Sequence, residues 1–365
     1  MSLRDTYPIP DIDPKWTVPQ DFEAVFDWEF DEGRNTLMHL YQKGKDMQWD
    51  AVNRIDWTQD LDFENPMQMP EEANGLYGSP IWEKMTKKER MESRRHGQAW
   101  NISQFLQGEQ AALLCASKIV QQVPDLDAKF YAATQVMDEA RHVEAYKKLL
   151  DKFGVAYPMT GPLQELVDQA LRDSRWDMTY LAMQVVIEGL ALAAFGTIRD
   201  IAQNPLARMV NAYVMEDEAR HVAFGRLSLR DYYPELTQAE RDEREEFLVE
   251  ACYLMRGRMT DATEVYEALG LPVKECVEWA ENSEITQLYR TLLFQRIVPI
   301  VKDIGLWGDK VQKAYADMGV MHYAEVDPQQ LQDDDERIAK TFDAQKIDPK
   351  GAREAYVHAV AGMAE

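Results

Sequence analysis

The sequence predicts an all-α protein built on a bundle of four long helices. Apolar residues recur at helical spacing from about residue 89 onward, and no stretch of any length shows the two-residue alternation of a strand. The chain has no Gly-rich phosphate loop. Two pairs of the expected helices also repeat each other in sequence, so the bundle should consist of two equivalent halves.

The four long helices are expected at about residues 89–122, 125–153, 174–203 and 205–231. The breaks between them fall at "VPDLD", "FGVAYPMTGP" and "NP", where Pro and Gly end or restart helices. A shorter helix is expected between the second and the third. Taken together as residues 90–231, these helices form the predicted four-helix bundle.

The flanking segments, residues 1–89 and 232–365, are expected to pack on this bundle within the same domain. The first is an irregular extension rich in Pro, Trp and acidic residues, with one helix near residues 22–42. The second begins with a helix that opens at "TQAERDEREEF" behind a Thr cap and continues with helices near 282–302. The stretch "DPQQLQDDDERIAK" has the composition of a solvated face.

The composition indicates a folded cytoplasmic protein and argues against two classes of partner. A net charge of -24, from 64 acidic and 40 basic residues, disfavours binding to a nucleic acid or an anionic membrane surface. The three cysteines form no CxxC pair, and the N-terminal segment lacks the apolar core of a signal peptide. Residues 178–198 are apolar enough to span a bilayer, but the polar helices around them favour a helix buried in the bundle.

An internal repeat is the strongest signal in the sequence. The stretches "QVMDEARHVEAY" and "YVMEDEARHVAF" repeat DEARHV, and superposing the two runs aligns the two halves of the bundle without a gap. The same alignment places Glu109 of "FLQGEQAALL" on Glu188 of "VVIEGLALAA". Each half is therefore a helix with one Glu, followed by Glu-x-x-His at the matching position of the next helix.

The two Glu-x-x-His pairs, Glu139 with His142 and Glu218 with His221, place two donor groups on one face of each helix. One such pair alone is more often a solvated charged face, but the duplication and the apolar neighbours of the two single Glu residues favour a metal site. Four buried carboxylates repel one another, and two divalent cations would cancel their charge. Oxygen and imidazole donors without a thiolate favour iron or manganese. This donor set is that of the ferritin-like carboxylate dimetal site.

On these motifs the sequence resembles the carboxylate-bridged diiron proteins of the ferritin-like superfamily. That superfamily includes multicomponent monooxygenase hydroxylases, acyl carrier protein desaturases and the ribonucleotide reductase small subunit. The resemblance covers about residues 90–231. It implies two sets of metal ligands, which are Glu109, Glu139 and His142 for one iron, and Glu188, Glu218 and His221 for the other. Glu139 and Glu218 would bridge, and the native pair stays open among Fe/Fe, Mn/Fe and Mn/Mn.

The resemblance also implies a set of residues that orient these ligands. In the superfamily the Asp before each ligating Glu orients an imidazole, and the motif Arg pairs with that carboxylate. The corresponding residues in this chain are Asp138, Arg141, Asp217 and Arg220.

A dry pocket beside the metals is expected from apolar residues near the two single Glu ligands, namely Phe105, Leu113, Leu192 and Phe195. Monooxygenase hydroxylases usually carry Thr at the position of Leu192, so protons would have to reach oxygen through water or another residue. Arylamine N-oxygenases carry a further His one turn before the last Glu-x-x-His, where this chain has Val214. The chain is therefore expected to lie outside that subgroup.

Tyr146 lies one turn after His142, at the position where the reductase small subunit carries its radical Tyr. The matching position in the second half is Gly225. Two interpretations stay open for Tyr146, which are a radical residue and an aromatic wall of the pocket with a hydrogen-bonded hydroxyl. Among the remaining histidines, His96 is expected at the surface.

The sequence thus predicts an oxidoreductase, a non-haem diiron monooxygenase that activates O2 to hydroxylate or otherwise oxidise a small organic substrate. No flavin, nicotinamide or iron–sulfur motif is visible, so an external reductase or ferredoxin is expected to supply the electrons. The habit of the superfamily implies a homodimer. The alternatives are a radical-generating or ligand-binding oxidase that resembles the reductase small subunit, and a ferroxidase or iron-storage protein.

Overall fold

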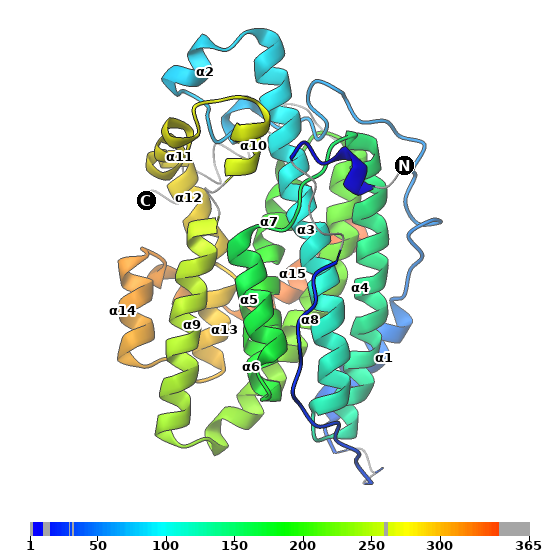
Figure 1. Cartoon of the computed structure of the whole chain (residues 1–365). Coiled ribbons are helices and arrows are strands. Elements are labelled where there is room, and N and C mark those ends of the chain that lie inside the picture. The colour runs from blue at the N-terminus through cyan, green and yellow to red at the C-terminus, as the bar shows by residue number, and fades with distance from the viewer. Residues whose placement is uncertain (1–2, 10–14, 29, 31–32, 259–261, 343–365) are drawn as a thin grey trace.

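The structure is a computed structural model that describes residues 3–9, 15–28, 30, 33–258 and 262–342. Within these ranges the chain forms helices, turns and irregular segments and contains no β-strand. The predicted all-α class is confirmed, with a ferritin-like four-helix bundle, additional helices and an irregular N-terminal extension (Figure 1). The division of the chain at residues 89 and 231 stays a prediction.

The bundle is formed by two pairs of consecutive helices. The first pair is α3 (Lys87–Gln122) and α4 (Leu126–Phe153), which pack along each other. The second pair begins with a continuous helix, Trp176–Ile201, and ends with α8 (Pro205–Tyr232). The continuous helix has three parts: α6 (Trp176–Tyr180), a π-helical stretch η3 (Leu181–Ile187) and α7 (Glu188–Ile201).

Local side-chain chemistry sets the ends of these helices. Thr86 and Glu89 form a reciprocal capping box at the start of α3. The side chains of Asp125 and Asn204 accept hydrogen bonds from the first turns of α4 and α8, at 2.8 and 3.1 Å. Gly154 ends α4 in the left-handed region, with φ of 68°, where a residue without Cβ is favoured. The observed ends therefore lie close to the predicted ones.

The remaining helices surround the bundle. Helix α5 (Gly161–Arg172) is the predicted short helix between the second and third long ones. The other elements in the described ranges are η1 (Leu3–Thr6), α1 (Asn35–Asp46), η2 (Glu71–Ala73), α2 (Pro80–Lys84), η4 (Tyr233–Glu235), α9 (Gln238–Arg258), α10 (Thr263–Ala268), α11 (Val273–Asn282), α12 (Glu284–Leu293), α13 (Ile297–Asp303), α14 (Asp309–Asp317), η5 (Met321–Glu325) and α15 (Pro328–Phe342).

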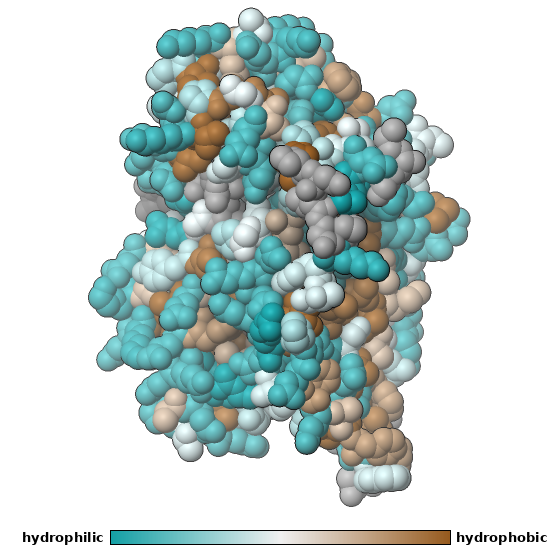
Figure 2. All heavy atoms as spheres, in the orientation of Figure 1, coloured by the Kyte–Doolittle hydropathy of each residue, from teal (hydrophilic) through white to brown (hydrophobic). Residues whose placement is uncertain are grey.

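The helix Trp176–Ile201 is long and apolar enough to cross a membrane, but 83% of its most apolar window is buried inside the structure. It is a core helix, as the sequence predicted. Helix α8 is buried along nearly its whole length, because α1, α4, α7 and α15 all pack on it. The face in Figure 2 is mostly hydrophilic, which agrees with the charge of -24.

The prediction of a helix near residues 22–42 is wrong in its position. Helix α1 begins only at Asn35, and residues 22–28 run as an extended strap. The backbone N–H of Val25 donates to the carbonyl of Gln121 at 2.8 Å. The last carbonyls of a helix have no partner within it, so the strap pairs with a carbonyl at the end of α3 that the helix itself leaves unused.

The prediction of a solvated face for "DPQQLQDDDERIAK" is wrong for one side of the helix that this stretch forms. This stretch contributes α15, in which Gln332, Asp335 and Glu336 are buried. Asp335 pairs with Arg296 at 2.7 Å and with Arg199 at 3.4 Å. The buried side of this helix therefore forms ion pairs with the bundle, whereas Asp333 and Arg337 are exposed on its other side.

His96 is likewise buried and not at the surface. Its Nδ1 lies 2.6 Å from the hydroxyl of Tyr157 and its Nε2 lies 3.4 Å from the carboxylate of Glu92. Burial, followed by the charge of Arg95, lowers the pKa of His96. His96 therefore belongs to a buried contact between α3 and the segment that follows α4.

Candidate metal centre

The six predicted ligands converge from four helices into one buried cluster. Glu109 comes from α3, and Glu188 is the first residue of α7. The two Glu-x-x-His pairs come from α4 and α8. None of the six side chains is more than 5% exposed. The repeated helical hairpin thus brings together all the donors that the sequence singled out.

The cluster divides into two overlapping groups of possible ligands. In each group, one donor atom from every residue lies within 4.8 Å of the others. The groups are Glu109, Glu139, His142 and Glu218, and Glu139, Glu188, Glu218 and His221. Glu139 and Glu218 belong to both groups, which is the geometry that two bridging carboxylates require.

The Nδ1 atoms of both imidazoles face the carboxylates. His142 Nδ1 lies 3.1 Å from Glu218 Oε1 and 3.3 Å from Glu109 Oε2. His221 Nδ1 lies 3.1 Å from Glu139 Oε1. The second half therefore repeats the first in three dimensions as well as in sequence.

Unpaired buried atoms indicate that this cluster fits metal ions. Among the described residues, Glu139 Oε2, Glu188 Oε2, both carboxylate oxygens of Glu218 and His221 Nδ1 have no hydrogen-bond partner. Buried polar atoms are normally paired, so five such atoms facing one another need a ligand. Hard oxygen donors with two imidazoles suit iron or manganese.

The electrostatics of the cluster also require positive charge. Burial, and next the charge of Glu218, raise the pKa of Glu109 and of Glu188 well above the usual range of a glutamate. Burial alone would lower the pKa of His142, but the charge of Glu109 and hydrogen bonds to neighbouring carboxylates raise it well above its usual value. Two divalent cations would displace such protons and cancel the four carboxylate charges.

The outward-facing nitrogen of each imidazole contacts the Asp of the other motif. His142 Nε2 lies 3.0 Å from Asp217 Oδ2, and His221 Nε2 lies 3.2 Å from Asp138 Oδ2. An Asp in this position holds Nε2 as the protonated nitrogen and leaves Nδ1 free to bind a metal. The sequence pointed to both Asp residues but did not reveal this exchange between α4 and α8.

Arg141 and Arg220 hold the two Asp residues in place. Arg141 donates to Asp138 and, at 2.8 Å, to Asp217, so it joins the two motifs. Arg220 donates to Asp217. Burial opposes the charge of Asp217, but Arg220 and its other cationic neighbours hold the pKa of this carboxyl well below the usual range. Asp217 is therefore ionised at neutral pH.

Two residues that follow α1 complete this network and were missed in the sequence. Gln48 Nε2 donates to Asp138 Oδ1 at 2.8 Å, and its Oε1 accepts from Arg141 at 2.7 Å. The indole of Trp49 donates to Asp217 Oδ2 at 2.7 Å. No sequence signal links them to partners so distant along the chain.

Gln135 is a further missed residue that contacts the predicted ligands directly. Its Nε2 donates to Glu139 Oε1 at 3.0 Å and to Glu188 Oε1 at 2.9 Å. The alignment of the two halves places Gln135 on Val214, so this amide has no counterpart in the other half. The difference between Gln135 and Val214 in otherwise matching motifs is the sequence signal that could have identified Gln135.

A second break in the repeat lies at Gly225, the counterpart of Tyr146. A Cβ at position 225 would overlap the Cβ of Gln184 in the π-helical stretch η3. Gln184 is the counterpart of Phe105 in the same alignment. The first half therefore has two aromatic rings where the second has an amide and a glycine.

Tyr146 is buried against one aromatic ring from each half of the repeat. Its hydroxyl donates to Asn211 Oδ1 at 3.1 Å, and its ring centroid lies 5.7 Å from those of Phe105 and Phe195. Burial, and then the charge of Glu109, raise the pKa of Tyr146 well above its usual value. The hydroxyl is therefore paired, and both interpretations of Tyr146, as a radical residue and as an aromatic wall of the pocket, stay predictions.

Two of the four predicted pocket residues line a cavity beside the cluster, which we call the inner cavity. It has about 500 Å³ including its open mouth. Phe105 and Phe195 line it together with Glu109, Glu188 and Glu218. Apart from the ligands and Gln104, its lining is apolar.

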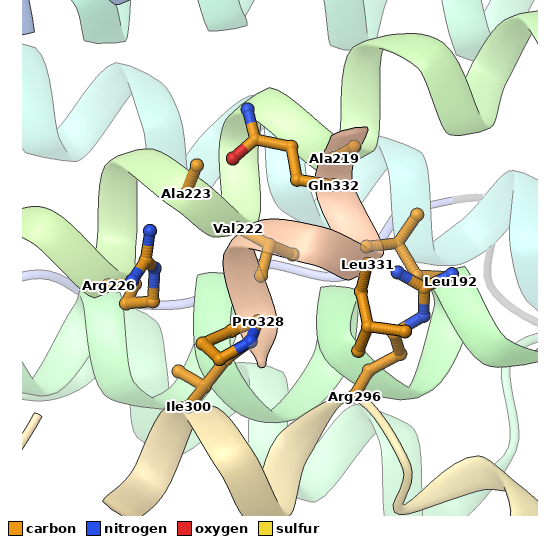
Figure 3. A pocket seen from close by; sticks show the side chains of 10 residues that line it. All are labelled: Leu192, Ala219, Val222, Ala223, Arg226, Arg296, Ile300, Pro328, Leu331 and Gln332. Carbon is orange, nitrogen blue, oxygen red and sulfur yellow. The ribbon is translucent and has the colours of Figure 1, made fainter. Parts of the chain in front are cut away.

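The other two predicted pocket residues lie elsewhere. Leu192 lines a separate cavity among α8, α13 and α15, together with Leu331 and Val222 (Figure 3). Leu113 is half-buried on α3 and is not part of the inner cavity lining. The position at which monooxygenase hydroxylases carry Thr therefore does not face the inner cavity in this chain.

The comparisons with known proteins agree with this architecture. The AurF family model, described as p-aminobenzoate N-oxygenase, matches residues 31–305, about three quarters of the 365 residues. A comparison with curated proteins gives no significant match.

Among solved structures, a Synechococcus protein with aldehyde deformylating oxidase activity is 16% identical, with 61% of this chain and 96% of that chain covered and a TM-score of 0.47. The R2-like ligand-binding oxidase from Sulfolobus acidocaldarius is 18% identical, with 77% and 93% covered and a TM-score of 0.45. These scores lie below 0.5, so the family assignment depends on the sequence match.

The expectation drawn from Val214, that the chain lies outside the N-oxygenase group, is wrong at the level of the family. The family model matches across this position although the side chain there is a buried Val and not His. The chain belongs to the AurF family and is an O2-dependent oxidoreductase of the ferritin-like superfamily, with a diiron centre as its cofactor.

Proposed function

We propose that this chain is an oxygenase that inserts oxygen from O2 into a small, uncharged and largely apolar organic substrate held in the inner cavity. The observation that carries the proposal is the convergence of six buried donors into two groups that share Glu139 and Glu218. In this proposal Glu109 and His142 complete one metal position, and Glu188 and His221 complete the other. A separate reductase or ferredoxin supplies the electrons.

The bound metal pair would supply electrons to O2, and the protein side chains would position and neutralise it. The four carboxylates balance two divalent cations, so the loaded site is neutral in a buried environment. Asp217 and Asp138 keep the Nε2 protons on His142 and His221, at 3.0 and 3.2 Å, and so direct Nδ1 toward the metals.

The lining of the inner cavity supports an uncharged substrate. Among the residues that the structure describes, it contains the carboxylates of Glu109, Glu188 and Glu218 and no basic side chain. An anionic substrate such as p-aminobenzoate, after which the family is described, would meet no cation on the protein there. Uncharged arylamines and alkyl-substituted aromatics are therefore the first substrates to test for N-oxidation or hydroxylation.

The experiment that tests the proposal combines metal analysis with rapid kinetics. The purified chain should contain or take up about two iron or manganese ions, and Glu139→Ala should lose them. The exposed Glu144→Ala on the same helix is the matched control. After anaerobic reduction, mixing with O2 should give a transient absorbance that decays faster when a substrate is bound.

Three outcomes would contradict the proposal. A chain that takes up no transition metal would exclude a dimetal site. Growth of a mineral core of many irons per chain would favour iron storage. A sharp tyrosyl EPR signal that disappears in Tyr146→Phe would favour the radical alternative.

A further inference from the structure

A second, larger cavity adjoins the inner one, and we call it the outer chamber. It has about 1260 Å³ including its open mouth. It lies between the N-terminal half of α3, the irregular segment 67–76, the end of α7 and helices α10 to α12. The metal ligands are not part of its lining. It is therefore distinct from the cluster described above.

Phe105 is the one described residue that the two linings share. Its ring meets Phe195 edge-on, with centroids 4.6 Å apart, on the side of the inner cavity. Phe105 is only partly buried because its other side faces the outer chamber. It lies one helical turn, about 6 Å along α3, before Glu109. The ring of Phe105 therefore lies between the outer chamber and the inner cavity.

The chemistry of the outer chamber contrasts with that of the whole chain. Although the chain carries a charge of -24, the described part of this lining contains one acidic side chain, Glu72, and one basic side chain, Arg94. The Arg94 guanidinium pairs with Glu71 at 3.4 Å. The remainder combines apolar and aromatic residues such as Trp100 and Ile198 with uncharged amides and hydroxyls such as Asn101 and Thr197. Such a surface fits an uncharged, apolar ligand.

We propose that the outer chamber binds the unreactive tail of an elongated apolar substrate and that Phe105 is the gate through which the reacting end enters the inner cavity. This inference rests on the proposed oxygenase function. Gly97 lies in the chamber wall two helical turns before Phe105, so the path from Gly97 to Glu109 extends about 18 Å along α3. Only an elongated molecule can occupy both cavities at once.

Gly97 offers a direct test because it lines the outer chamber alone. A Cβ at this position would meet no atom within 4 Å, so a larger side chain can be placed there without a clash at its base. Gly97→Leu should fill part of the outer chamber and leave the inner cavity and the metal ligands unchanged. Phe105→Ala should remove the gate.

The experiment measures anaerobic binding of straight-chain primary alcohols of increasing length to the metal-loaded chain, by calorimetry and stopped flow. In the natural chain the Kd should fall by about fourfold for each buried methylene until both cavities are filled. In Gly97→Leu the Kd should stop falling at a shorter alcohol length. The affinity for the longest alcohols should be at least about tenfold lower than in the natural chain, and the affinity for the shortest should be unchanged. Phe105→Ala should speed association at every length.

Equal length profiles for Gly97→Leu and the natural chain would overturn the inference, as would an unchanged association rate in Phe105→Ala. Metal content of both variants should match that of the natural chain, because neither residue is a predicted ligand. A chain that binds two metals and reacts with O2 but binds no long alcohol would exclude the outer chamber and leave the oxygenase function standing. A chain without metal that still shows the length profile would exclude the oxygenase function and not the chamber.

Discussion

The exchange of Asp residues between the two motifs gives a sharp prediction for Asp217→Asn. Asp217 accepts hydrogen bonds from His142 at 3.0 Å, Trp49 at 2.7 Å and Arg141 at 2.8 Å, and it also pairs with Arg220. Asn keeps the shape of the side chain but removes a full negative charge, because Asp217 is ionised in the folded protein. Either orientation of the amide also points an NH2 group at a buried donor.

Two magnitudes follow for this substitution. Loss of the charge next to buried Arg220 should lower the stability of the metal-free protein by about 3–5 kcal/mol, the usual cost of breaking a buried ion pair. Loss of the acceptor for His142 should weaken the metal position that His142 serves by about 10–100-fold. The position served by His221 should keep its affinity, although Asp217 and His221 belong to the same sequence motif.

The assay is an anaerobic Co²⁺ or Mn²⁺ titration in two single-site backgrounds. In a His221→Ala background His142 holds the remaining ion. Asp217→Asn should then lower the affinity for this ion by the full 10–100-fold, or about 1.4–2.7 kcal/mol, which is the usual effect of removing the hydrogen-bond acceptor of a ligating imidazole. In a His142→Ala background the same substitution should change the affinity by less than about threefold.

A larger loss in the His142→Ala background would refute the exchange of Asp residues between the motifs. Asp177→Asn is the control for stability, because Asp177 forms a buried ion pair with Arg244 at 2.9 Å outside the cluster. It should destabilise the chain and leave the metal affinity unchanged.

Three further substitutions test single contacts. Gln135→Val removes the donor to Glu188, so the affinity of the metal position served by Glu188 should fall about tenfold or more in the same titration. Gly225→Ala places a Cβ against Gln184, and overpacking should lower the free energy of unfolding by about 1–3 kcal/mol in a denaturant melt. His96→Gln should reduce the loss of stability in acid. Because burial lowers the pKa of His96 in the folded state, the stabilisation from its neutral form is complete above the unfolded pKa of about 6.5 and is lost as the pH falls below it.

Matched controls make these outcomes decisive. Val214→Gln introduces the amide into the other half of the repeat, and an equal effect of both changes would contradict a specific role for Gln135. Gly97 lies in a helix, and a Cβ there would have no neighbour within 4 Å, so Gly97→Ala should stabilise the chain by about 0.5–1 kcal/mol. A loss of stability in Gly97→Ala would contradict the steric reasoning for Gly225. A melting temperature of His96→Gln that falls in acid as steeply as that of the natural chain would contradict the assignment of His96 as a buried neutral base.

The helix ends and the six donors could be predicted because both are local in sequence. Capping residues such as Thr86 and Asn204 act within one helical turn, and the Glu-x-x-His spacing fixes which side chains share a face. The repeated DEARHV run then related one helical pair to the other without any knowledge of their packing.

The pocket could be predicted only in part. Phe105 and Phe195 line the inner cavity, but Leu192 faces α15 instead. Residues 189–196 of α7 are all apolar or glycine, so their periodicity cannot show which side meets a cavity and which side meets a neighbouring helix. The π-helical stretch η3 just before Glu188 also changes the phase of the helix, and no sequence signal announced it.

The sequence by itself determined the helical class, the boundaries of the long helices and the identity of the six donors, since each depends on interactions within a few residues. Only the tertiary structure decided that Asp217 serves His142, that Trp49 and Gln48 reach the motifs from the N-terminal extension, and that Phe105 separates two cavities. These contacts join segments far apart in the chain, and their partners are chosen by packing, which leaves no periodic trace in the sequence.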